Sequence, residues 1–127
     1  MPRLAPTPAV PIPEVTTEVY KRNVARQIYR ANSDQLFEGP LPPLLKAVIV
    51  LNVHVDSRGQ PVRITVMRSN GMRTLEAIAT QSVRNAAPLP APGRLLQRGY
   101  AEIVETWLFR ADNRFQVRSL AERQLNE

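Results

Sequence analysis

The stretch from residue 47 to residue 68, AVIVLNVHVDSRGQPVRITVMR, decides the fold. Its first part, Ala47 to Asp56, alternates apolar residues with mixed ones, which is the period of a strand with one buried face. A second alternating run, Val62 to Arg68, follows a turn in which Gly59 is free to adopt a positive φ. Two strands joined this closely predict an antiparallel hairpin with one dry face. The residues expected on that face are Ile49, Leu51, Val53 and Val55, followed by Val62, Ile64 and Val66.

A helix is predicted on each side of this hairpin. The first spans Glu18 to Ala31, with Thr16 or Thr17 as its N-cap. Its apolar face carries Tyr20, Val24, Ile28 and Ala31. The second helix has the apolar stripe Leu75, Ile78, Ala79, Ser82, Val83 and Ala86. Thr74 or Ser69 is expected to cap its start, and Pro88 ends it near Ala87.

The run GYAEIVETWLFR, residues 99–110, is rich in β-branched and aromatic residues and predicts a third strand. ADNR offers a turn, and FQVR, residues 115–118, is long enough for a short fourth strand. We therefore expect a small α+β domain, with two helices on one face of an antiparallel sheet of three or four strands. The order is helix, strand, strand, helix, strand.

Composition divides the chain of 127 residues into three parts. Residues 1–17 are proline-rich and predict an extended linker, residues 18–118 form the domain, and residues 119–127 form a polar tail. There is no cysteine, so disulfides and cysteine-based metal sites are excluded. No apolar run of about 18 residues is present, so the sequence given predicts no membrane-spanning helix.

The net charge of +6 is compatible with nucleic acid, acidic lipid or an acidic protein partner. Arg22, Arg26 and Arg30 fall four apart and form one stripe on the first predicted helix, where the simplest interpretation is a solvated face. Modules that bind single-stranded RNA stack bases on aromatic residues of central strands, and the first two predicted strands have none. Nucleic acid is therefore the less favoured partner.

The sequence contains few residues that could take part in catalysis. His54, the only histidine, shares a strand face with Asp56, but no glycine–serine–glycine elbow accompanies them. One histidine with scattered carboxylates does not predict a metal site. The turn Ser69-Asn70-Gly71 lacks the lysine and further glycines of a phosphate-binding loop, so it is interpreted as backbone geometry. We expect no enzyme activity, no catalytic residue, no cofactor and no metal.

The run from residue 48 to residue 92 resembles the C-terminal domain of TonB and TolA proteins. The resemblance covers about residues 19–117, and its matching positions are Asp56, Gly59, Ser69, Gly71, Leu75, Glu76, Ala79, Val83, Arg84, Pro88, Pro90 and Pro92. The family's Gln-Pro-x-Tyr-Pro segment before the first strand is replaced here by FEGPLPPLLK. The leading helix is more similar to TolA, and the run ETWLFRADNRFQVR is more similar to TonB.

The resemblance implies a periplasmic domain of a Gram-negative bacterium, carried on a proline-rich stalk with an inner-membrane anchor upstream. Such domains couple the proton motive force, through inner-membrane motor proteins, to the outer envelope. A TonB-like domain binds outer-membrane transporters, and a TolA-like domain works with Tol-Pal-type proteins in envelope integrity. Exposed strand edges leave open both a monomer and a strand-swapped homodimer.

Partner binding is expected at the third strand, where an extended peptide could add as a further strand. TonB-like domains capture a transporter segment beside their last long strand, so the resemblance implies the same site. The residues predicted to contact the partner are Glu102, Val104, Glu105, Thr106, Trp107, Leu108, Phe109 and Arg110. Of these, Val104, Thr106 and Leu108 are expected to face the helices, and Glu105, Trp107 and Phe109 to be partly open. Phe115 to Arg118 is either a removable guard over this edge or a permanent fourth strand.

Overall fold

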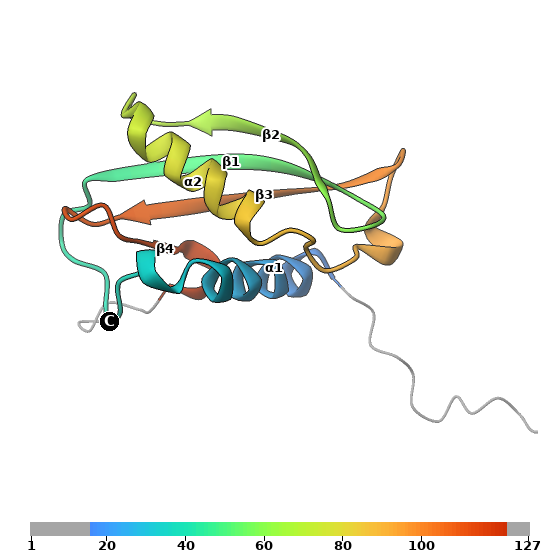
Figure 1. The fold of residues 1–127 in the computed structure, drawn as a ribbon, viewed down its shortest axis with the longest axis horizontal. Coiled ribbons are helices and arrows are strands. Elements are labelled where there is room, and N and C mark those ends of the chain that lie inside the picture. The colour runs from blue at the N-terminus through green and yellow to red at the C-terminus, as the bar shows by residue number, and fades with distance from the viewer. Residues whose placement is uncertain (1–15, 122–127) are drawn as a thin grey trace, which may run out of the picture.

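A computed structural model describes residues 16–121, and it contains two helices and one sheet of four strands (Figure 1). The elements are α1 (Thr17–Ala31), β1 (Ala47–Asp56), β2 (Pro61–Arg68), α2 (Arg73–Asn85), β3 (Tyr100–Phe109) and β4 (Phe115–Val117). The strands are antiparallel and lie in the order β2-β1-β3-β4. The predicted α+β fold is confirmed, including the fourth strand. The predicted linker and tail lie almost wholly outside the described residues.

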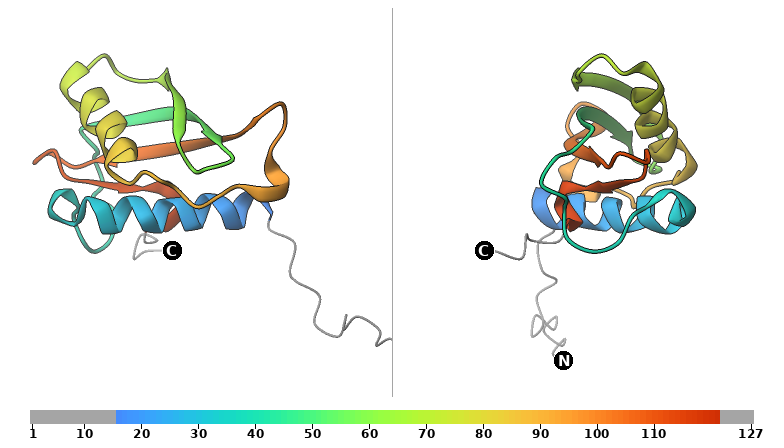
Figure 2. Two further views of the ribbon diagram at one scale, coloured as in Figure 1. Left: turned by 45° about the vertical axis from the view of Figure 1, so that its right-hand side comes forward. Right: turned by 90° about the vertical axis from the view of Figure 1, so that its left-hand side faces the viewer.

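The core lies between the sheet and the two helices. β1 pairs with β3 without interruption from Ala47↔Phe109 to Asp56↔Tyr100. One face of these two strands is covered by α1 and α2, and we call it the helix face (Figure 2). Its buried residues are Ile49, Leu51, Val53 and Val55 of β1, and Ala101, Ile103, Glu105, Trp107 and Phe109 of β3. The opposite side, which carries His54 and Glu102, is called the open face.

α1 begins where the sequence predicts a cap. The Thr16 side chain accepts a hydrogen bond from the N–H of Val19 at 3.1 Å. Tyr20, Val24 and Ile28 are buried as predicted, and the Tyr20 hydroxyl donates to the carbonyl of Pro90 at 2.7 Å. Ala31 was expected on this face but is exposed, because it ends the helix.

α2 buries most of the predicted stripe, and Ser82 connects it to the sheet. The Trp107 Nε1–H donates to Ser82 Oγ at 3.0 Å, and Ser82 Oγ donates to the carbonyl of Ala79 at 2.6 Å. The predicted caps were wrong, since Met72 occupies the N-cap position and no side chain bonds there. Ser69 instead donates to Glu76 at 2.5 Å, across the first turn of the helix.

The proline-rich exit of α2 packs on the β1–β2 turn. The carbonyl of Gly59 accepts a hydrogen bond from the N–H of Leu89 at 2.7 Å. Gly59 has φ of +86°, and a Cβ atom at this position would lie 2.0 Å from the carbonyl oxygen of Leu89. Only glycine fits both the conformation and the close approach.

β2 does not bury all of the apolar residues that were expected on the dry face of the hairpin. Ile64 packs against the core, but Val62 and Val66 are exposed. The reason is that β2 is the edge strand, and its register with β1 shifts twice, between Val50 and Leu51 and between His54 and Val55. A periodic pattern alone does not distinguish a covered strand from an edge strand.

β4 is built into the core rather than laid over it. Phe115 and Val117 are fully buried, and the ring of Phe115 lies 5.7 Å from that of Phe109. The turn before β4 is held by the Arg110 guanidinium, whose hydrogen bond lowers the pKa of Asp112 to about 2.

The segment between α1 and β1, residues 32–46, crosses the open face of the sheet at β3 and β4. The side chain of Gln116 donates to the carbonyls of Phe37 and Gly39, at 3.0 and 2.8 Å. In Figure 2 this segment runs on the side of the sheet opposite α2. Leu108, the register partner of Gln116, is buried on that side.

Candidate partner-binding edge

The outer side of β3 is paired at its two ends and has no strand partner between them within the described residues. β4 pairs only with Trp107 to Phe109. At the other end, Gln97 exchanges backbone hydrogen bonds with Tyr100 at 2.8 and 3.3 Å. No strand in the described part of the chain pairs with Ala101 to Thr106 on this side. We call this stretch the β3 free edge.

Alternate residues of the β3 free edge direct their backbone polar groups outwards. The N–H groups of Tyr100 and Arg110 both bond away from β1, to Gln97 and Arg114. Because successive residues of a strand direct N–H and C=O to opposite sides, Glu102, Val104 and Thr106 share this direction. An incoming strand would therefore bond to these three residues.

One of the three outward donors is already occupied. The N–H of Thr106 donates to Glu105 Oε2 at 2.8 Å, and Glu105 is 5% exposed on the helix face. The other carboxylate oxygen, Oε1, is buried without a hydrogen-bond partner. An inward-pointing charged residue is one of the devices by which edge strands are kept from pairing. Glu105 thus closes one end of the β3 free edge.

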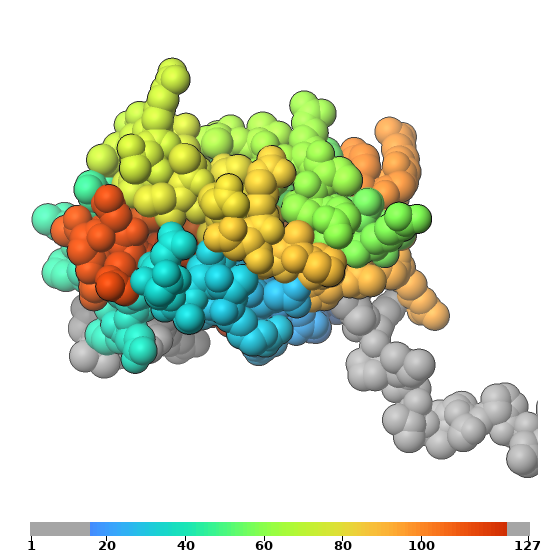
Figure 3. All heavy atoms as spheres, viewed as in Figure 1, coloured from blue at the N-terminus to red at the C-terminus, as the bar shows by residue number. Residues whose placement is uncertain are grey.

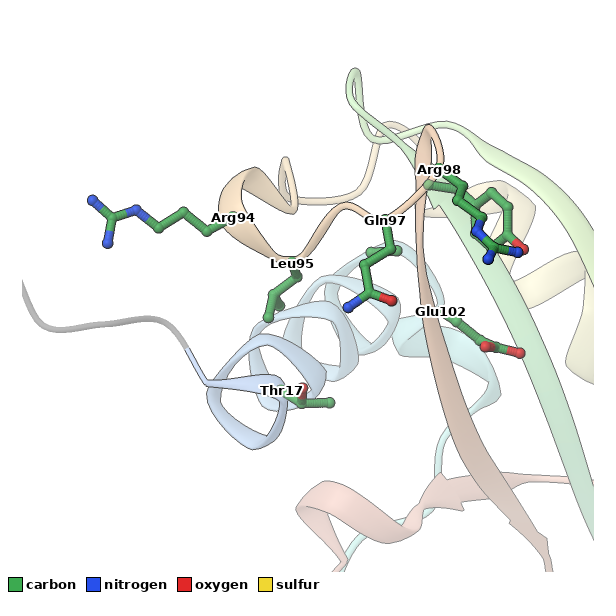
Figure 4. Close-up of a pocket in the computed structure, with 8 residues that line it drawn as sticks. Thr17, Arg94, Leu95, Gln97, Arg98 and Glu102 are labelled. Carbon is green, nitrogen blue, oxygen red and sulfur yellow. The ribbon is translucent and has the colours of Figure 1, made fainter.

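A cleft of about 440 Å³ lies beside the N-terminal part of this edge. It is lined by Thr17, Arg94, Leu95, Gln97, Arg98, Tyr100, Ala101 and Glu102. In Figure 4 Leu95 and Gln97 point into the cleft, whereas Arg94 points away from it. The cleft separates β3 from the start of α1 and gives an extended segment access to the edge.

Polar side chains on the open face hold Glu102 against the sheet. Asn52 Nδ2 donates to Glu102 Oε2 at 2.6 Å, and His54 Nε2 lies 3.4 Å from the same oxygen. The hydrogen bond from Asn52 is the main cause of the lowered pKa of Glu102, followed by that from His54. The ring of His54 stacks on Tyr100 with centroids 4.1 Å apart. This leaves the backbone of Glu102 as the group offered at the edge.

The predicted faces of β3 were wrong. Glu105, Trp107 and Phe109 are buried on the helix face, while Val104 is exposed on the open face. The register explains this, because Leu51↔Glu105 and Ile49↔Trp107 place these residues beside the buried face of β1. Thr106 also lies on the open face, where it is half-buried.

Of the eight predicted contact residues, Glu102, Val104 and Thr106 combine accessible side chains with outward backbone groups. Trp107 and Leu108 lie where β4 already pairs, and Arg110 lies over the ring of Phe37 at 4.7 Å. Phe115 and Val117 belong to the core, which favours the permanent fourth strand over the removable guard. β4 does not pair with the β3 free edge, and the 3₁₀ turn that follows it, Arg118–Leu120, packs against β3 and α1.

Of the residues that line the cleft, the sequence reasoning identified only Glu102. Thr17, Leu95 and Gln97 come from the start of α1 and from the segment before β3, and no local pattern brings them together. The one signal in the sequence was Gly99, because glycine readily adopts a positive φ. Arg98 and Gly99, both with positive φ, form the turn that folds Gln97 back on Tyr100.

The possible catalytic pair considered from the sequence is not assembled. Asp56 accepts hydrogen bonds from the N–H groups of Arg58 and Gln60, each at 2.9 Å, and Glu102 is the carboxylate beside His54. Ser69 accepts from the N–H of Gly71 at 3.0 Å, as a turn residue does. Within residues 16–121 no three His, Asp or Glu side chains gather as metal ligands would, and no helix is long and apolar enough to cross a membrane.

A comparison with protein-family models, with curated proteins and with solved structures finds no match for this chain.

Proposed function

We propose that this domain binds an extended segment of a partner protein by strand addition at the β3 free edge. The observation that carries the proposal is the pair Glu102 and Val104, whose outward backbone groups pair with no strand of the described residues, and Glu102 also lines the cleft. Main-chain hydrogen bonds would give affinity, and the cleft would select side chains. No catalytic role is proposed for any residue.

The partner class comes from the resemblance to TonB and TolA domains. Positions that carry this resemblance have structural roles in the domain. Gly59 packs on the exit segment, Ser69 bonds Glu76, and the carbonyl of Pro90 holds Tyr20. On this basis the domain is the periplasmic end of a TonB-like energy transducer, and its partner is the exposed segment of an outer-membrane transporter. Inner-membrane motor proteins would act through an anchor outside this chain.

A TolA-like role in envelope integrity is the second candidate. It is favoured by α1, a helix of 15 residues that packs along the core before β1. The two roles differ in their partners, because a TolA-like domain would bind Tol-Pal-type envelope proteins. Both use the same fold and the same free edge.

Photo-crosslinking in a Gram-negative host tests the proposal. A photoreactive amino acid at Val104, in the full-length protein, should give adducts that mass spectrometry identifies. The matched control is the same amino acid at Arg22, which is exposed on α1 and does not line the cleft. Adducts with a transporter at position 104 alone would support the TonB-like role, and adducts with a Tol-Pal-type protein the TolA-like role. Equal adducts at both positions would reject the docking site.

A further inference from the structure

The outer edge of β2 is the second free edge of the sheet. β2 pairs with β1 on one side and with no described strand on the other. Arg63 and Thr65 bond towards β1, as the pairs His54↔Arg63 and Asn52↔Thr65 require, so Ile64 and Val66 direct their N–H and C=O outwards. This edge is longer than the β3 free edge, and it has no counterpart of Glu105.

Apolar side chains are exposed along the same strand. Val62 is 58% exposed, Met67 57% and Val66 39%. They are three of the six large apolar side chains that are exposed in residues 16–121. A long edge strand that keeps apolar residues in water is otherwise prone to pair with another chain. The concentration of these residues on β2 therefore marks an interaction surface.

A groove runs between this edge and α2. It has a volume of about 700 Å³ and is lined by Val66, Gly71, Arg73, Glu76, Ala77, Thr80 and Gln81. Figure 3 shows the α2 residues (yellow) beside those of β2 (green) at the upper rim of the molecule. Ala77 and Thr80 are small, so the side chains of an added strand would fit between that strand and α2. The lining mixes polar and apolar residues, and apolar side chains of such a strand would lie beside Val66 and Ala77.

The charge around the β2 edge is positive. Arg58, Arg63, Arg68 and Arg73 are exposed, and none of them forms an ion pair within the described residues. Two carboxylates, Asp56 and Glu76, are close in sequence to these arginines, which outnumber them by four to two. Arg63 and Arg68 are register partners of His54 and Val50, so they project on the open face. The excess of positive charge favours an anionic partner.

We propose that the outer edge of β2 binds an acidic extended segment of another protein as a fifth strand. Its apolar side chains would enter the groove beside α2, and its alternate carboxylates would meet Arg63 and Arg68. A second copy of this chain fits less well. Antiparallel pairing of two β2 strands brings these arginines onto one face of the joined sheet, and like charges on neighbouring strands repel. This inference does not depend on the proposed function, because it concerns the opposite edge of the sheet.

The experiment selects binders from a displayed library of random peptides, with the full chain as the target. We expect enriched peptides to alternate Asp or Glu with Val, Ile or Leu. Affinity, measured by fluorescence anisotropy, should fall about tenfold or more in Val66→Pro and in the double variant Arg63→Glu/Arg68→Glu, because charge pairs and main-chain bonds both contribute. Proline at the outward position of an edge strand removes a donor without breaking the β1–β2 ladder.

Two matched controls locate the binding. Arg22→Glu/Arg26→Glu makes the same charge change on α1, and Val104→Pro makes the same backbone change on β3. Both should keep affinity within about twofold, since neither touches the β2 edge. The proposal would be overturned by an equal loss of affinity in the α1 variant or by a loss of affinity in Val104→Pro alone. Selected peptides that are not enriched in acidic residues would also overturn it. So would a homodimer, seen by sedimentation, that Val66→Pro converts to monomer.

Discussion

The carboxylate of Glu105 lies 2.8 Å from the backbone nitrogen of Thr106 and accepts its N–H at the point where β3 becomes a free edge. The same side chain is buried on the helix face, beside residues that are otherwise mainly apolar. A polar side chain in this position does not improve the packing of the core. Its physical effect is to occupy a donor that another strand would use.

The first prediction follows from this hydrogen bond. Glu105→Val should free the N–H of Thr106 and lengthen the available edge by one residue. We expect tighter binding of an extended peptide at β3, or self-association of the domain, by about three- to tenfold, as one added hydrogen bond gives. Glu105→Gln keeps an acceptor for Thr106 and should behave as the unchanged protein. Sedimentation and peptide titration that show no difference among the three proteins would contradict the role of Glu105.

The second prediction concerns β4. Phe115→Ala should lower the free energy of unfolding by about 3–5 kcal/mol, because it leaves a cavity beside Phe109 in a fully packed site. Removal of residues 114–127 should then unfold the domain rather than expose a binding site. Urea denaturation followed by circular dichroism measures both effects. A truncated domain that unfolds as cooperatively as the full chain would restore the removable guard.

The third prediction concerns the hydrogen bond between Trp107 and Ser82. Ser82→Ala leaves the buried indole N–H without an acceptor, which should cost about 1–3 kcal/mol of stability. Ser82→Thr retains the hydroxyl and serves as the control. Trp107 is the only tryptophan, so its fluorescence reports unfolding directly. Equal stability of the alanine variant and the unchanged protein would show that this bond contributes nothing.

The fourth prediction is a pH dependence. Burial raises the pKa of Tyr20 from 10.0 to about 12, because the neutral phenol is favoured in the core. A raised pKa in the folded state stabilises the fold below pH 10 and loses this contribution as pH rises from 10 to 12. Tyr20→Phe cannot ionise, so its stability should decline less over this range, although it loses the bond to Pro90. Parallel decline of the two proteins, in urea titrations at each pH, would exclude Tyr20 as the titrating group.

The fold was predicted best where the apolar residues of an element follow a single period. In β1 and α2 the apolar positions follow a single period, and their burial matches the expectation. β3 was harder, because Val104 and Leu108 alternate with Trp107 and Phe109 and both sets are apolar. Glu105 also breaks the face that is buried. The choice between the faces depends on the register with β1 and on the segment that covers Leu108, and these are long-range contacts.

The site was predicted only in part for the same reason. The strand that offers the free edge was identified, but the extent of that edge depends on where β4 and Gln97 pair with it. Three residues of β4 cover one end, and a turn with two positive φ values covers the other. The local sequence of β3 does not indicate how many residues are covered at either end. The cleft likewise combines side chains from distant segments.

The measurement that tests the central claim most directly is hydrogen exchange of the β3 amides, followed by NMR with and without the peptide segment identified by crosslinking at Val104. In the free protein the N–H groups of Glu102 and Val104 should exchange rapidly, while those of Ile103 and Glu105 are protected by β1. Saturation with the peptide should protect Glu102 and Val104, which gives the alternation of an added strand. Amides of Glu102 and Val104 that are protected before the peptide is added, or that still exchange rapidly at saturation, would contradict the claim that β3 is the docking edge.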